Sequence, residues 1–176
     1  GDWDDASNWA NGVVPKLSGE AANITGAYTQ DAEITVGTPE AVKLTVNFTG
    51  GKTVTLQGAS AEARHLVVTN QCLNISEGRL AVKDLDLDLG FPGNHAMNLS
   101  ADANKAKGQF SYLDLLGDSR LFLVGNLLIA GGNSPGGLLT VADTATLAPQ
   151  YLFVGRGTNA QGGLVQRGGT VAPWTE

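Results

Sequence analysis

The sequence predicts an all-β chain that forms a right-handed parallel β-helix, with coils of about 24–26 residues. The first observation is self-similarity, because residues 146–149 (Thr-Leu-Ala-Pro) and residues 170–173 (Thr-Val-Ala-Pro) match at an offset of 24. The second is that apolar residues recur at nearly the same spacing. They predict two internal ladders, Leu87, Leu113, Leu139 and Leu164 in one, and Leu121, Leu147 and Val171 in the other.

The third observation is that connections typical of other β folds are scarce. Two-residue hairpin turns between matched strands are few, and the intervals between runs are too short for βαβ crossovers. Parallel stacking must then come from coiling of the chain. The alternative is a β-sandwich or jelly roll, which short and evenly spaced strands also suit.

The strands themselves are predicted by alternation. Between residues 25 and 89 most apolar runs alternate with period two and end at Gly, Asn or Pro, which is typical of short strands joined by turns. Val54 matches Leu80 at an offset of 26, so the repeat begins before its clearest part. Residues 90–108 interrupt this rhythm and predict an irregular loop with a short helix. We expect a single domain, with a capping segment over residues 1–24 and a solenoid over residues 25–176.

Composition limits the classes of partner. Charged residues make up 16% of the chain, well below the usual quarter, and 24 of the 176 residues are Gly, which suits a β protein with many tight turns. The net charge is −6 and no Lys/Arg cluster is present, which argues against nucleic acid and anionic membrane surfaces as partners. No apolar run approaches 18 residues, so we expect no membrane insertion. Cys72 is the only cysteine, which excludes a disulfide framework within the chain.

The first fifteen residues concentrate two of the three tryptophans, Trp3 and Trp9, in a segment without helical or strand periodicity. Indole rings bury a large area each. One interpretation is a lid that covers the open end of the solenoid core. The other is an aromatic platform that stacks on sugar rings.

This opening also resembles a known family. The pattern Trp3…Asn8-Trp9…Pro15, followed by Glu20, resembles the start of secreted bacterial β-helix proteins of the autotransporter-passenger type. In that family a Trp-x(n)-Asn-Trp-x(n)-Pro segment precedes an acidic residue, usually Asp, and a run of loosely repeated coils.

The C-terminal part resembles the same family. Residues 162–171, Gly-Gly-Leu-Val-Gln-Arg-Gly-Gly-Thr-Val, resemble its coil repeats, although Arg167 stands where those repeats usually have Ser or Thr. The resemblance covers the first 24 residues and roughly the last 60. It implies a β-helix repeat protein that is secreted or exposed on the cell surface.

The most pointed polar feature is residues 84–88, Asp-Leu-Asp-Leu-Asp, in which alternation sends leucines to one face and aspartates to the other. If Leu87 and Leu113 stack, Asp88 and Asp114 become neighbours one strand spacing apart. Such a pair predicts a bound cation or one carboxyl that titrates high. Asp86, Asp88 and Asp114 are therefore calcium candidates, and carboxylate pairs also serve polysaccharide hydrolases. The other interpretation is a solvated acidic face.

Four aromatic residues are candidates for stacking on a glycan: Trp3, Trp9, Tyr151 and Trp174. The stretch 126–176 carries only four charges, which suits packing against another protein surface or a neutral polysaccharide. The sequence then stops just after a repeat. A minimal cap formed by Pro173 and Trp174, continuation into a longer array, and association with another molecule are all compatible with this ending.

From these observations we expect a structural or adhesive extracellular module of a bacterial surface or secreted protein, which self-associates through the solenoid ends. Its expected partners are copies of itself, surface proteins or neutral polysaccharide. We expect no catalytic residues and no cofactor other than calcium. The alternatives are a carbohydrate-binding module, and a fragment of a polysaccharide hydrolase or lyase that uses Asp86, Asp88 and Asp114.

Overall fold

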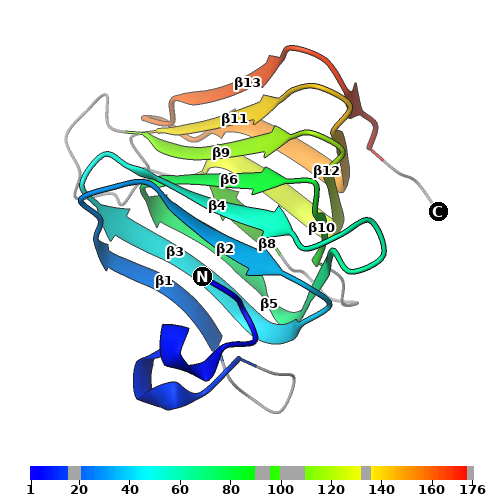
Figure 1. Cartoon of the computed structure of the whole chain (residues 1–176). Coiled ribbons are helices and arrows are strands. Elements are labelled where there is room, and N and C mark those ends of the chain that lie inside the picture. The colour runs from blue at the N-terminus through cyan, green and yellow to red at the C-terminus, as the bar shows by residue number, and fades with distance from the viewer. Residues whose placement is uncertain (16–20, 90–95, 100–109, 132–135, 174–176) are drawn as a thin grey trace.

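A computed structural model describes residues 1–15, 21–89, 96–99, 110–131 and 136–173. The chain is a parallel β-solenoid of about five turns (Figure 1). Within the described residues it has no α-helix, and its helical segments are two 3-10 turns, η1 (Ala6–Asn8) and η2 (Ala10–Gly12). None of these helices is long and apolar enough to cross a membrane.

Two stacked sheets form the walls of the solenoid. The short-strand sheet, in front in Figure 1, has six strands: β2 (Ala32–Val36), β4 (Thr53–Gly58), β6 (Arg79–Lys83), β9 (Ser111–Leu116), β11 (Gly137–Val141) and β13 (Gly162–Gln166). The long-strand sheet behind it has eight: β1 (Ala21–Ala27), β3 (Glu40–Thr49), β5 (His65–Glu77), β7 (Asp86–Leu89), β8 (Ala96–Leu99), β10 (Arg120–Gly131), β12 (Thr146–Arg156) and β14 (Thr170–Val171).

The strand pairings confirm the predicted coiling. Each turn contributes one strand to the short-strand sheet and then enters the long-strand sheet, so neighbours in a sheet come from successive turns. Every pairing between the described strands is parallel. The sandwich and jelly-roll alternative is therefore wrong, because those folds are built from antiparallel strands.

The predicted ladders are correct except at one residue. Leu113, Leu139 and Leu164 stack in successive turns, and so do Leu121, Leu147 and Val171. The match of Val54 with Leu80 is also a true strand register.

The exception is Leu87, which belongs to a different ladder from the one predicted. It pairs with Leu66 and Leu121 in the long-strand sheet, whereas the residue stacked beneath Leu113 is Leu80. The turn between β6 and β9 contains β7, β8 and their connections, so its offset is 33 residues instead of 26. Because alternation repeats every two residues, a coincidental 26-residue match still joins two apolar positions.

The interruption predicted for residues 90–108 is only partly irregular. Ala96–Leu99 form β8, which pairs with β5 and β10 and continues the long-strand sheet. Met97 and Leu99 of this strand are fully buried, so the run Ala-Met-Asn-Leu is a half-buried strand. The helix expected over residues 101–107 lies outside the described residues.

Inward-facing side chains of both sheets meet in one continuous apolar core. One ladder in the long-strand sheet joins residues of six strands: Ile24, Val46, Ile75, Leu99, Ile129 and Val154. Each turn covers the apolar side chains of the turn before it, so burial depends on having neighbours on both sides.

Candidate functional site

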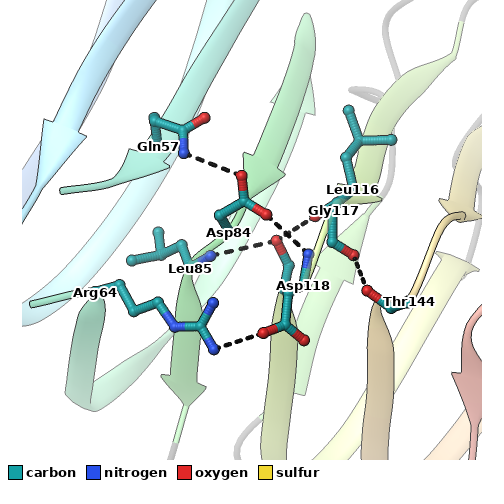
Figure 2. A network of polar contacts seen from close by, with 9 residues as sticks. Gln57, Arg64, Asp84, Leu85, Leu116, Gly117, Asp118 and Thr144 are labelled. Carbon is teal, nitrogen blue, oxygen red and sulfur yellow. Dashed lines mark hydrogen bonds and ion pairs between the residues drawn. The ribbon is translucent and has the colours of Figure 1, made fainter. Parts of the chain in front are cut away.

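One corner of the solenoid carries a network of polar contacts (Figure 2). Continuing the registers of the short-strand sheet places five residues at equivalent corner positions, which alternate between glycine and aspartate: Gly58, Asp84, Gly117, Asp143 and Gly168. Both aspartates have left-handed backbone, with φ of 48° and 56°. Aspartate tolerates this region because its short side chain bonds locally.

The aspartate side chains connect successive turns. The Asp84 carboxylate accepts a hydrogen bond from the Asp118 backbone N–H at 2.9 Å and lies 3.3 Å from the amide nitrogen of Gln57. Asp143 accepts from the backbone N–H of Gly117 at 2.8 Å. A Cβ on Gly117 would collide with the Asp84 carboxylate, so glycine alternates with aspartate at this corner.

These bonds explain the electrostatics of the corner. The hydrogen bond from Asp118 N–H, followed by that from Gln57, lowers the pKa of Asp84 below its ordinary value. Arg64 pairs with the Asp118 carboxylate at 2.8 Å, and this bond raises the pKa of Arg64. Asp84 and Arg64 thus each contact a residue of a neighbouring turn, and these contacts link successive turns at the corner.

The predicted carboxylate pair is wrong. Asp114 lies on β9 of the short-strand sheet, whereas Asp86 and Asp88 lie on β7 of the long-strand sheet. Asp114 is only 8% exposed and forms an ion pair with Arg79 at 2.7 Å. The prediction depended on Leu87 stacking with Leu113, and the two residues lie in different sheets. Within the described part of the chain no three His, Cys, Asp or Glu side chains are grouped so that they could hold a metal ion.

Asp86 and Asp88 instead line a shallow cleft of about 210 Å³ on the outer face of the long-strand sheet. Leu87 of the same strand also lines it, and the neighbouring strands add His65 from β5 and Arg120 and Phe122 from β10. Sequence reasoning missed these three because the register between β5, β7 and β10 cannot be deduced from the regular repeat. The only available signal was that His65 begins a strand.

The four predicted glycan-stacking rings are not brought together. Trp3 is fully buried, so it has no free face for a sugar. Trp9 packs edge-on against it with ring centroids 4.8 Å apart, and its indole N–H donates to the Trp3 carbonyl at 2.6 Å. Tyr151 is 55% exposed on β12, far along the stack from the tryptophans. Trp174 lies outside the described residues.

The two ends of the stack differ in how far inward-facing core residues are buried. At the N-terminal end, Ile24 in the first turn is only 3% exposed. At the C-terminal end, Val154 stands in the same ladder and is 44% exposed, although Ile129 beneath it is fully buried. Leu152 is likewise partly exposed, whereas its register partner Leu127 is fully buried. Within the described residues, inward-facing positions of β12 are therefore more exposed than their register partners in β10.

The backbone is also open at this end. β14 pairs with only two residues of β12, Thr146 and Leu147. Among the described residues, 148–156 have a partner strand on one side only, β10. An edge strand with exposed apolar side chains is a template for pairing with another chain. Two exposed cations, Arg156 and Arg167, belong to the last turn.

Comparisons with protein-family models, curated proteins and solved structures found no match. The resemblance to β-helix repeat proteins is thus supported by the structure alone and at the level of architecture, because the chain forms a β-solenoid.

Proposed function

We propose that the chain is a structural and adhesive module of a secreted or cell-surface bacterial protein, which stacks head to tail with a second copy through its C-terminal end. The observation that carries the proposal is the exposure of Val154, an inward-facing residue of a ladder whose earlier described members are buried. Burial of apolar surface of this kind contributes about 25 cal/mol per Å². A second copy would supply the turn that covers it.

The N-terminal end of a second copy suits this surface in both backbone and charge. β1 is the opposite edge of the long-strand sheet and, within the described chain, pairs only with β3. A neighbour's β1 added to β12 would continue the parallel sheet. The N-terminal segment exposes Asp2, Asp4 and Asp5, which complement Arg156 and Arg167 of the C-terminal end.

Such an interface joins two different surfaces of the same chain. Heterologous contacts that do not close into a ring extend into filaments. A solenoid with continuous internal ladders is a suitable unit for a filament or stalk, because its length is set by the number of turns. The resemblance to autotransporter passengers supports placing this module outside the cell.

The test measures the size distribution of the chain by sedimentation velocity and negative-stain microscopy over a range of concentrations. We expect species larger than dimers that lengthen with concentration. Val154→Lys should abolish them, because a charge would be placed in the interface core. Arg120→Gln, on the outer face, is the matched control and should assemble normally. Monomers at every concentration, or closed dimers only, would overturn head-to-tail stacking.

A charge exchange tests the two surfaces directly. Replacing Arg156 and Arg167 by Glu makes both ends acidic, and replacing Asp2 and Asp4 by Lys makes both ends basic. Each double variant alone should assemble weakly, whereas an equimolar mixture should form alternating filaments. Equal assembly of the separate variants and their mixture would remove charge complementarity from the interface.

A further inference from the structure

We infer that the cleft on the outer face of the long-strand sheet binds one neutral sugar unit of a glycan. The cleft is lined by Leu87 and by five outward-facing residues, His65, Asp86, Asp88, Arg120 and Phe122, and its volume is about 210 Å³. This is smaller than the range of about 300–1,000 Å³ that is typical of drug-sized ligands. It therefore suits a single ring held at the surface, with the rest of the glycan in solvent.

The strand register explains why these side chains meet. Asp86 lies between His65 on one side and Arg120 on the other, and Asp88 lies beside Phe122. All five point outward, because their neighbours on the same strands face the core. Adjacent strands are about 4.8 Å apart, so a ligand seated over the central strand β7 lies within reach of side chains from all three strands.

Among the described residues, no hydrogen bond joins the polar side chains of the cleft to one another. Asp86 and Arg120 are direct register partners, yet they form no ion pair, and the Asp86 carboxylate accepts no hydrogen bond from any described residue. The Arg120 guanidinium lies instead over the Phe122 ring, 5.4 Å from its centroid. His65 Nε2 is 3.7 Å from the Asp88 carboxylate, a distance at which a protonated imidazole forms an ion pair but no hydrogen bond.

This combination selects the chemistry of the ligand. Two carboxylates disfavour phosphates and uronates, since a like charge would be placed beside them. The polar lining disfavours an apolar ligand, which would leave these groups without partners. Vicinal hydroxyls fit, because a carboxylate accepts from them while a guanidinium and an imidazole donate to their oxygens.

Each lining residue then has a role in binding. Asp86 and Asp88 accept hydrogen bonds from sugar hydroxyls, and Arg120 donates to a ring or hydroxyl oxygen. Phe122 holds the Arg120 guanidinium across its ring face and so positions this donor in the cleft. An open cleft of this size, with few contacts, predicts millimolar affinity for a single sugar.

The experiment uses the full chain carrying Val154→Lys, which leaves the cleft intact and is expected to stay monomeric, labelled with nitrogen-15. It is titrated with sugars that share one ring and differ in charge. The neutral probes are the methyl glycosides of glucose, galactose and mannose, and the charged probes are glucosamine and glucuronate. At least one neutral glycoside should shift the backbone amide resonances of residues 86–88 and 120–122 in a saturable way. Absence of saturable shifts with all three, or tighter binding of either charged sugar, would overturn the inference.

Variants locate the binding. Asp86→Asn should raise the dissociation constant for the best neutral glycoside about tenfold, because the hydrogen bond to a charged acceptor is replaced by one to a neutral acceptor. The matched control is Glu33→Gln, which neutralises an exposed carboxylate on β2 of the short-strand sheet. It should bind as the original chain does. Unchanged affinity in Asp86→Asn, with an unchanged melting temperature, would place the sugar elsewhere and refute the cleft assignment.

Discussion

The first and the last described turns of this solenoid differ in how far their inward-facing apolar side chains are covered. At the first end, Trp3 and Trp9 pack edge to face over the core, and the Trp3 backbone N–H donates to the Thr35 carbonyl at 2.9 Å. At the last end, Val154 and Tyr151 are exposed, and most of β12 has a neighbour on one side. The difference shows that a lid must form hydrogen bonds with the backbone at the sheet edge as well as cover apolar side chains.

The lid achieves both with a short segment. Asp2 forms an isolated parallel bridge with Thr35, so the first residues extend the short-strand sheet beyond β2. The chain then turns through η1, where the Asp5 carboxylate caps the helix by accepting the Ser7 N–H at 2.9 Å. The Ser7 hydroxyl also donates to this carboxylate at 2.7 Å, and this bond, followed by that from the Ser7 N–H, lowers the pKa of Asp5. The aromatic pair is thus held by backbone and capping bonds as well as by burial.

The largest effect is expected at the closed end. Trp3→Ala should lower the free energy of unfolding by about 3–5 kcal/mol, because it removes a fully buried indole and opens a cavity over the first turn. Tyr151→Ala, at the open end, should change it by less than about 0.5 kcal/mol in the monomer. Urea unfolding followed by circular dichroism measures both. Equal losses at the two residues would refute the contrast between the ends.

A second comparison follows one ladder from the middle to the open end. Leu139→Ala should cost about 2–5 kcal/mol, since Leu139 is fully buried between Leu113 and Leu164. Leu164→Ala should cost about 1 kcal/mol, because that side chain is partly exposed on β13, the terminal strand of the short-strand sheet. Under conditions in which head-to-tail stacking occurs, the Leu164 variant should lose more. A cost at Leu164 equal to that at Leu139 in the monomer would contradict an open end.

The smallest effect is expected at the corner, where Asp84 is bonded to turns on both sides and Asp143, among the described residues, only to the turn before it. Asp84→Asn should cost about 0.5–1 kcal/mol at neutral pH, because it keeps an acceptor and loses the charge. The lowered pKa of Asp84 means that its stabilisation is present above the ordinary value of 3.8 and is lost as pH falls through the folded-state pKa.

The difference between the original chain and Asp84→Asn should therefore disappear in acid. Urea midpoints measured from pH 7 to pH 2 would show this convergence. Asp143→Asn is the control for the left-handed backbone, which both positions share. A difference that persists unchanged to the lowest pH would mean that the Asp84 charge does not stabilise the fold.

The site was less predictable than the fold, and Asp88 shows why. Its outward direction followed from alternation with Leu87 and Leu89, which are buried as expected. Its neighbours did not follow, because they depend on the register between β7 and the strands on either side. An irregular turn between β6 and β9 separated Asp88 from Asp114 and placed Asp88 beside Phe122.

The sequence by itself determined the solenoid, its core-facing positions and the two ladders that end at Leu164 and Val171. Those features depend on local alternation and on a spacing that recurs along the chain, and both can be read without coordinates. Only the tertiary structure decided the composition of the cleft, the Gly–Asp alternation at the corner and the contrast between Ile24 and Val154. Each of these depends on which turn lies above or below a residue, and one longer turn is enough to change that neighbour.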